Sequence, residues 1–387
     1  MISSGSFRLR SPLVASLAVC VITALAIVVG ASAGNTKNGN NTVAQADPGL
    51  AAAKKNLLAH IAPPAKIGPT APIGKPIPTG KTILHSNCGV EGCVYMGDGL
   101  KEAAKVLGWK VETINVVPTP QGIQAYFDEA IRRKPDGVVS VGFPAAVYQR
   151  QLAKLKSMGI PVVSANALDK PVGGIVVQIE GIKWSAQATA LVADKTIVDS
   201  GGKGVIGVAL LTEYPIVAAY TKAYTDEIAK NCPKCKTKTI ELAPTDIGKD
   251  AAQKIANFLR ANPDIKYLFL SYDPLGSGLK TAARNAGASM PLVYSWSQGK
   301  EGLAALRTGA LKAGVPQDYY MQGWMFADAF ARVFTGQNPA AQGSTWPGFV
   351  LWSKDYKNIP AAPKGQVVPD ITPGYRDQFK KLWGMSK

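Results

Sequence analysis

Aromatic and acidic side chains stand at the ends of two neighbouring apolar runs in the second half of the chain. Tyr272 and Asp273 follow the run 267–271, and Trp296 follows the run that begins at 291. A helical pattern separates the two runs, so the segment has the order strand, helix, strand. Buried strands connected in this way form a parallel sheet, and ligands of such sheets bind outside the carboxyl ends of the strands. The three side chains therefore predict a small-molecule binding site.

The elements that position these side chains alternate regularly between strands and helices. With 387 residues, the chain is also long for a single hydrophobic core. Expected strands lie at 82–86, 110–116, 137–141, 161–164, 174–179, 204–210, 236–242, 267–271, 291–294 and 311–315. Expected helices lie at 98–107, 122–133, 147–158, 185–198, 216–230, 249–261, 279–286, 301–308 and 319–334. Short right-handed crossovers give doubly wound sheets, and there are more strands than one compact sheet needs. We therefore predict an α/β fold with two doubly wound parallel-sheet lobes.

The first eighty residues differ in composition from the rest. Residues 1–33 carry two arginines, a long apolar run and the small-residue sequence ASA at 31–33, which together are typical of a secretory signal peptide. The apolar run also fits an uncleaved membrane anchor, and Cys20 stands in a weak lipid-attachment motif. Residues 34–80 form a Pro- and Gly-rich tether and arm, with one short helix expected at 48–60. These features predict an extracytoplasmic protein, either secreted or tethered to the membrane.

Four cysteines beyond the leader form two close pairs. Cys88 lies near Cys93, and Cys232 lies near Cys235. In an oxidising compartment this spacing predicts two short-loop disulfides. A four-thiolate zinc site and a thioredoxin-like pair are the alternatives, but the pairs are far apart in sequence and the second pair follows a helix. We expect no metal and no cofactor.

The charge and the histidine content narrow the class of function. A formal net charge of +17 is compatible with nucleic-acid binding. The lysines are scattered, however, so we expect no nucleic acid and instead a peripheral contact with an anionic membrane or wall surface. The sequence contains two histidines, His60 and His85, and no nucleophile elbow, zinc-binding H-E-x-x-H pair or phosphate-binding loop. We expect a binding protein and not an enzyme.

Four short segments, in their order and spacing, resemble the type I periplasmic binding proteins, the ribose- and galactose-type solute-binding subunits of ABC importers. They are AAKVLG at 103–108, KPDGVV at 134–139, MGIPVV at 158–163, and YD at 272–273 followed by GLKTAA at 278–283. The resemblance implies two lobes connected by a three-segment hinge near Glu180, Pro316 and Gly348. Lobe 1 then comprises 81–180 and 317–348, lobe 2 comprises 181–316 and 349–362, and 363–387 form a C-terminal extension. We expect a monomer.

The resemblance also implies which residues hold the ligand. Carried over by position, they are Asn87, Glu91, Tyr95, Phe143 and Asn166 in lobe 1, and Glu213, Tyr214, Thr245, Asp246, Tyr272, Asp273, Trp296 and Gln317 in lobe 2 and the hinge. Trp296 stands where sugar-binding members commonly carry an aspartate, and Glu213 and Tyr214 replace an arginine. Fewer acids and more rings predict a ligand that is flatter or less hydroxylated than a free hexose.

The predicted function is capture of a small ligand, either a sugar or a less hydroxylated carbon source, and its delivery to an ABC permease. A ligand sensor that presents its closed form to a membrane receptor has the same fold and stays open as an alternative. A repressor of the lactose type is disfavoured, because the leader and the Pro-rich arm occupy the place of its helix-turn-helix.

Overall fold

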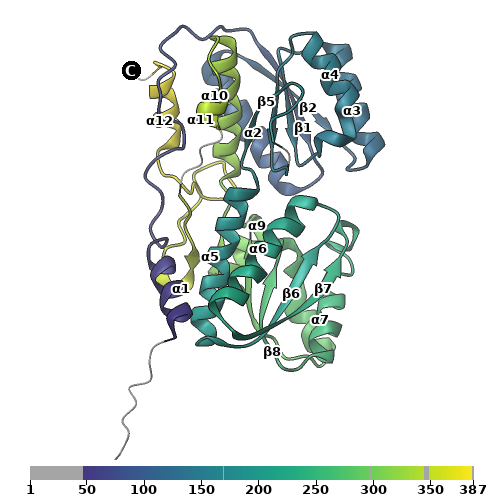
Figure 1. Ribbon diagram of the computed structural model, residues 1–387, viewed down its shortest axis with the longest axis vertical. Helices are drawn as coiled ribbons and strands as arrows, with labels where there is room; N and C mark the ends of the chain where they lie inside the picture. The colour runs from purple at the N-terminus through teal and green to yellow at the C-terminus, as the bar shows by residue number, and fades with distance from the viewer. Residues whose placement is uncertain (1–46, 169, 297, 344–347, 386–387) are drawn as a thin grey trace, which may run out of the picture. The chain divides into compact units, whose positions relative to one another are not determined.

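The computed structural model describes residues 47–168, 170–296, 298–343 and 348–385. They form two α/β lobes, each built around its own sheet (Figure 1). The predicted leader at 1–33 lies outside the described residues. Within them, no helix is both long enough and apolar enough to cross a membrane.

The sheet of lobe 1 has five parallel strands in the order β2-β1-β3-β4-β5. The strands are β1 (Thr82–Asn87), β2 (Lys110–Asn115), β3 (Gly137–Val141), β4 (Val162–Ala165) and β5 (Ile175–Ile179). The helices of this lobe are α2 (Glu91–Leu107), α3 (Pro120–Arg133), η1 (Ala145–Tyr148), α4 (Gln149–Ser157), α10 (Tyr319–Phe334), α11 (Ala340–Gly343) and α12 (Tyr375–Leu382). Every residue of β3 and β4 is buried, as expected for central strands covered by helices on both faces.

The sheet of lobe 2 has six strands in the order β11-β10-β9-β8-β6-β7. The strands are β6 (Lys203–Leu211), β7 (Lys234–Leu242), β8 (Ile265–Leu270), β9 (Leu292–Trp296), β10 (Ala313–Val315) and β11 (Trp352–Ser353). The helices are α1 (Pro48–Leu58), α5 (Ile182–Ser200), α6 (Pro215–Asn231), η2 (Pro244–Asp246), α7 (Ala251–Ala261), η3 (Asp273–Gly276), α8 (Leu279–Asn285), α9 (Lys300–Thr308) and η4 (Lys354–Tyr356). All pairings are parallel except that of the edge strand β11. The predicted fold of two doubly wound parallel sheets is confirmed.

The chain passes from one sheet to the other beside Glu180, between β5 and α5, and again between β10 and α10. The expected third crossing, near Gly348, borders residues 344–347, which lie outside the described part. Each lobe has a separate hydrophobic core. Helix α10 begins directly after the second crossing and is almost completely buried, with its apolar residues in the core of lobe 1.

The segments at both ends of the described chain pack against the lobes. Ala53 and Leu57 of α1 belong to the core of lobe 2, whereas Ile67 and Ile73 of the following arm belong to the core of lobe 1. The arm therefore runs from one lobe to the other, as its purple trace in Figure 1 shows. Helix α12 of the C-terminal extension also packs into the core of lobe 1.

Helix α2 begins at Glu91, seven residues before its predicted start. Its first half contains glycines at 92, 97 and 99, which have low helix propensity and hide the helix from a pattern search. Close packing against α10 offsets this low helix propensity. A Cβ atom on Gly92 would lie 2.6 Å from the ring of Tyr319, and one on Gly99 would lie 2.1 Å from the Tyr320 carbonyl oxygen. The glycines allow α2 and α10 to pack closely.

Candidate functional site

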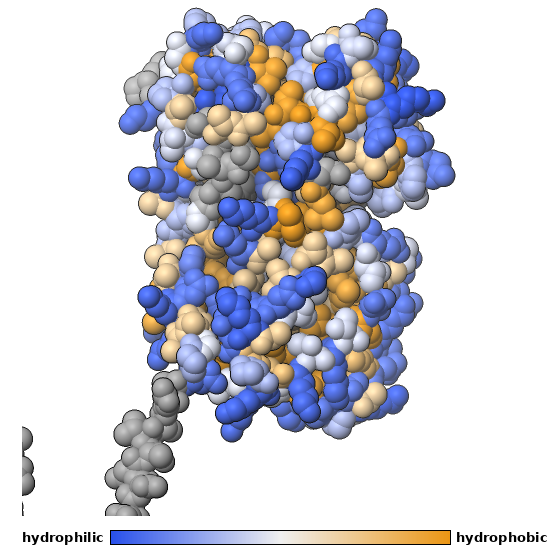
Figure 2. All heavy atoms as spheres, in the orientation of Figure 1, coloured by the Kyte–Doolittle hydropathy of each residue, from blue (hydrophilic) through white to orange (hydrophobic). Residues whose placement is uncertain are grey.

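A cavity lies between the two lobes, at the carboxyl ends of their strands. Its volume, including the mouth that opens to solvent, is about 690 Å³. This value is within the range of roughly 300–1,000 Å³ found for small-molecule sites. Lobe 1 and the hinge contribute Cys88, Val90, Gly92, Cys93, Met96, Val141, Gly142, Asn166, Glu180, Gln317 and Tyr319, and lobe 2 contributes Ser185, Leu211, Tyr214, Ile216, Val217, Tyr220, Tyr272 and Trp296. Hydrophobic spheres are visible where the two lobes face each other, while most of the same face of the molecule is hydrophilic (Figure 2).

Five aromatic rings form much of the cavity wall. They belong to Tyr214, Tyr220, Tyr272, Trp296 and Tyr319. Trp296 is the last residue of β9, and its ring centroid lies 5.5 Å from that of Tyr220. The hydroxyl group of Tyr220 donates to the Ser271 carbonyl oxygen at 2.9 Å, which fixes the ring at the edge of the cavity. Aromatic side chains therefore make up much of the surface that a ligand would contact.

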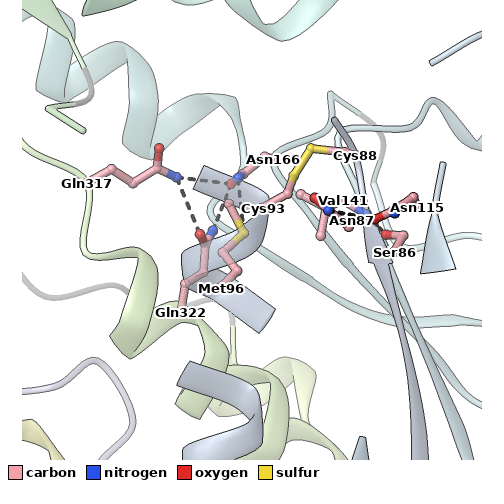
Figure 3. The surroundings of a disulfide bond; sticks show 10 residues. All are labelled: Ser86, Asn87, Cys88, Cys93, Met96, Asn115, Val141, Asn166, Gln317 and Gln322. Atoms are coloured by element: carbon pink, nitrogen blue, oxygen red, sulfur yellow. Dashed lines mark hydrogen bonds between the residues drawn. A yellow bond between two sulfur atoms is a disulfide. The ribbon is translucent and has the colours of Figure 1, made fainter. Parts of the chain in front are cut away.

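A polar cluster at the hinge closes the cavity on one side. Glu180 Oε2 accepts hydrogen bonds from Nε2 of Gln317 and from Nε2 of Gln322, the latter at 2.8 Å. Glu180 Oε1 accepts one from the Ser185 hydroxyl group at 3.3 Å. The Gln322 amide also donates to Asn166 Oδ1 at 2.8 Å, so one amide from α10 connects the residues that follow β4 and β5. Figure 3 shows Gln317, Gln322 and Asn166 pointing toward one another beside the disulfide.

Glu180 is a buried acid with no cationic partner in the described part of the chain. Its side chain contacts amide and hydroxyl donors, and none of the described residues that line the cavity is a lysine or an arginine. Burial raises the pKa of Glu180 to about 8, and the three neutral donors oppose that rise. Both Glu180 (φ 50°) and Asn166 (φ 53°) adopt the left-handed conformation, which is strained for residues other than glycine and is concentrated at functional sites.

Both predicted disulfides are present, and one of them lines the cavity. Cys88 and Cys93 connect the end of β1 to the first turn of α2, and Met96 lies on the same side of the cavity. The Asn166 amide nitrogen lies 3.9 Å from Met96 Sδ. The other disulfide, between Cys232 and Cys235, connects α6 to β7 and is remote from the cavity lining.

Five of the residues expected from the sequence line the cavity. They are Asn166, Tyr214, Tyr272, Trp296 and Gln317. The other lobe 1 candidates make contacts with the protein itself. Asn87 donates to Asn115 Oδ1 at 2.8 Å, Tyr95 stacks on Tyr320 at 5.5 Å, and Phe143 is buried in the core. Glu91 accepts from the Tyr95 hydroxyl group and, across the cleft, from the Lys300 backbone N–H at 3.1 Å.

The remaining lobe 2 candidates also lie outside the cavity lining. Asp246 Oδ1 accepts from Lys254 Nζ at 2.6 Å, and the neighbouring Thr245 and the Glu213 side chain are exposed. Asp273 Oδ2 accepts from the backbone N–H groups of Gly299 and Gly302, both at 3.0 Å. Asp273 therefore satisfies orphan donors at the start of α9, whereas the helix that directly follows it in sequence is α8.

Among the polar and aromatic residues that line the cavity, four were not expected from the sequence as ligand-binding residues. Glu180 was expected only as a hinge position, and Ser185, Tyr220 and Tyr319 lie inside helices, where the pattern indicates packing. Their position along the chain, directly after a predicted crossing between the lobes, could have identified two of them. Tyr319 begins α10 directly after the second crossing, and Ser185 lies in the first turn of α5 directly after the first.

Comparisons with known proteins agree with this architecture. Residues 87–338 match the family model described as a periplasmic binding protein domain. A solved ABC transporter solute-binding protein from Burkholderia graminis, in complex with D-arabinose, has 20% sequence identity and a TM-score of 0.64, and the match covers 73% of this chain and 98% of that chain. No curated protein sequence matches this chain.

Two further solved structures have the same fold. A glucose-galactose binding protein from Geobacillus stearothermophilus matches at 18% identity and a TM-score of 0.63, covering 73% of this chain and 100% of that chain. A periplasmic ribose ABC transporter protein from Conexibacter woesei matches at 19% identity and a TM-score of 0.59, covering 75% and 98%. Because the family match also spans more than half of the sequence, this chain belongs to the type I periplasmic binding proteins.

Proposed function

We propose that this protein captures a small organic solute between its two lobes, outside the cytoplasm, and delivers it to an ABC importer. The observation that carries the proposal is the cavity lined from both lobes at the carboxyl ends of their strands. Solute capture is the activity of the family, and family membership also supports the extracytoplasmic location.

The solute is less hydroxylated than a free hexose. A sugar carries hydroxyl groups around its rim, and each of them needs a hydrogen-bonding partner when it is buried. In this cavity the polar side chains gather at the hinge, and several of their donors and acceptors are already used in bonds to one another. The rest of the wall is apolar or aromatic. Several structural neighbours were solved with sugars, such as D-arabinose and D-allose, so this departure separates the present chain from them.

Ligand binding is coupled to closure of the lobes. A ligand that contacts both lobes stabilises the closed arrangement, and the hinge lets the lobes separate when it leaves. The hydrogen bond from Lys300 N–H in lobe 2 to Glu91 in lobe 1 adds a direct contact in the closed form. An importer therefore receives a surface that differs between the empty and the loaded protein.

A thermal-shift screen of the full-length protein tests this function. The panel contains sugars, polyols, nucleosides, aromatic acids and aliphatic and aromatic amines. A ligand that binds the native state and not the unfolded chain raises the Tm, by an amount that grows with ligand concentration. We expect at least one poorly hydroxylated compound to raise the Tm. A rise in Tm with sugars alone contradicts a poorly hydroxylated ligand. No rise in Tm with any compound of the panel contradicts solute capture.

A further inference from the structure

We propose that the solute held in this cleft is a small organic cation, whose ammonium group lies against the Glu180 carboxylate between the aromatic rings. The inference rests on the proposed function and assigns the chemical class of its ligand. It follows from three features of the cavity: its charge, the open acceptor position on Glu180 and the arrangement of rings.

The charge of the cavity is opposite to that of the whole protein. The chain has a formal net charge of +17, yet Glu180 is the charged residue among those that line the cavity. Glu91 lies close enough to Tyr272 for its charge to contribute to the raised pKa of that tyrosine, after burial as the main cause and Tyr319. Low-dielectric walls strengthen and focus the potential of such groups. When Glu180 is ionised, a cationic solute is attracted into this cleft and an anionic solute is repelled.

Glu180 retains one place for a ligand. A carboxylate has about four lone-pair positions. Oε2 uses two of them for Gln317 and Gln322, whereas Oε1 accepts, from the described residues, only the Ser185 hydroxyl group, at 3.3 Å. These neutral donors hold the side chain in position without cancelling its charge. An ammonium group at Oε1 supplies both the missing hydrogen bond and the missing positive charge.

The rings supply the rest of the site. The face of an aromatic ring is negative and attracts a cation within about 6 Å, with tryptophan the strongest of the three ring types. Trp296, Tyr214, Tyr220, Tyr272 and Tyr319 line the same cavity as Glu180. Rings alone also suit a neutral aromatic ligand, but a neutral ligand supplies no positive charge to favour the ionised form of Glu180. An aromatic carboxylate meets no lysine or arginine among the described lining residues.

Burial has a further consequence for the empty cleft. The pKa of Glu180 is raised to about 8, so the carboxyl group is mostly protonated at neutral pH when nothing compensates its charge. A bound cation favours the ionised form, and its binding at pH 7 therefore releases a proton. Proton release is measurable by titration calorimetry in buffers of different ionisation enthalpy.

Matched ligand pairs test the inference on the full-length protein. Each pair has a cation and an uncharged compound of nearly the same shape: choline with 3,3-dimethylbutan-1-ol, benzylamine with benzyl alcohol, and cyclohexylamine with cyclohexanol. D-ribose, D-glucose and benzoate complete the panel. We expect the cation of at least one pair to bind roughly tenfold or more tightly than its uncharged partner, with proton release at pH 7.

Two variants separate the role of Glu180 from general electrostatics. Glu180→Gln keeps the shape and the amide contacts, and we expect it to reduce the ratio of cation affinity to uncharged-partner affinity about tenfold. Glu241→Gln removes one exposed acid from β7 and is expected to leave the preference as it is. Equal binding of cations and uncharged partners, or binding of sugars or benzoate alone, overturns the inference and leaves solute capture intact. Failure of every compound to bind overturns both proposals.

Discussion

Asp328 in lobe 1 and Glu180 at the hinge are both buried carboxylates, but they have different partners. Asp328 accepts from Arg332 Nε at 2.8 Å and from Trp383 Nε1 at 2.9 Å, so a cation and a donor satisfy it within the protein. Glu180 accepts from two amides and a hydroxyl group, all of them neutral. Burial raises the pKa of both groups. Arg332 opposes the rise for Asp328, whereas neutral donors alone oppose it for Glu180.

The difference separates a structural acid from a ligand-binding acid. The ion pair of Asp328 and Arg332 connects α10 to the C-terminal helix through Trp383 and to the arm through the Ala71 carbonyl oxygen, 2.8 Å from Arg332 Nη2. It therefore holds three distant parts of the chain on lobe 1. Glu180 lies in the cavity, and the described residues leave one of its acceptor positions unfilled. We propose that a bound solute supplies the positive charge that this carboxylate lacks. A buried charge stabilises a fold only when its partner is buried with it.

The largest effect is expected at the internal pair. Arg332→Met leaves Asp328 buried and unpaired, which should lower the free energy of unfolding by roughly 3–5 kcal/mol. The double variant Arg332→Met with Asp328→Leu should recover most of that loss. Denaturant unfolding of the ligand-free protein measures both. As a control, Arg133→Ala removes exposed ion pairs with Glu112 and Glu129 and should cost at most about 1 kcal/mol. Equal losses at the two arginines contradict the structural role of the pair.

The next largest effect is expected on ligand affinity at Trp296. Trp296→Ala removes a ring that lines the cavity and should weaken binding by roughly 1–3 kcal/mol, the value of burying one large apolar side chain. Calorimetry with the ligand found in the screen measures the change. Trp109→Ala is the matched control, because it removes a buried indole from lobe 1 that has no part in the cavity. Unchanged affinity together with lowered stability makes Trp296 a core residue.

The pH dependence of stability should reveal Glu180. Its folded-state pKa of about 8 is above the ordinary value of 4.5, so the folded protein binds more protons than the unfolded chain between these values. The free energy of unfolding therefore falls as the pH rises through this window. Glu180→Gln removes the fall and should stabilise the ligand-free protein at pH 9 by roughly 1–3 kcal/mol, with little change at pH 4.

Unfolding curves of both proteins at several pH values test this expectation. The pKa of the neighbouring Tyr220 is raised well above its ordinary value, mainly by burial and then by Tyr319 and Glu180. Tyr220 therefore ionises above this pH window and does not contribute to the change in stability within it. If Glu180→Gln instead destabilises the protein at pH 9, the charge of Glu180 is compensated within the protein, as that of Asp328 is, and the difference between the two acids disappears.

The smallest effect is expected at the contact between the lobes. Glu91→Gln replaces the charged acceptor of the Lys300 N–H by a neutral one, and the closed form should lose about 0.5–1 kcal/mol. Ligand Kd should rise by about two- to fivefold, and small-angle scattering should show more open protein at half saturation. Glu301→Gln, at the start of the same helix, is the control, because no hydrogen bond or ion pair connects it to lobe 1 within the described residues. Equal effects of both substitutions indicate a general effect of lost charge and contradict a specific role for the hydrogen bond between Glu91 and the Lys300 N–H.

The sequence predicted the fold well because its signals were local. Strand β3 and helix α10 have the predicted bounds, and both lie in regions where the apolar pattern is continuous. Trp296 and Tyr272 could be placed in the cavity because a parallel sheet directs the ends of its strands toward one edge. The start of α2 could not be predicted, because its glycines are compatible with a helix only through contacts with α10, more than 200 residues away.

The polar part of the site depended on such distant contacts. Asp273 follows a strand, as a ligand-binding acid would, yet it caps α9, because Gly299 and Gly302 bring their N–H groups to it. Glu180, by contrast, was expected only as a hinge residue and lines the cavity. Gln317, just before α10, and Gln322, within it, present neutral amides and no cation to Glu180. The order of residues along the chain does not reveal that these groups face one another.

In our proposal, Glu180 obtains its positive partner only when a cationic solute binds. Titration of the full-length protein with choline at pH 6 and pH 9 tests it most directly, because choline keeps its charge throughout and any change in affinity comes from the protein. We predict that choline binds several-fold more tightly at pH 9, where Glu180 is ionised, and that Glu180→Gln abolishes the change. Affinity that is the same at both pH values, or the same for choline and 3,3-dimethylbutan-1-ol, contradicts the account.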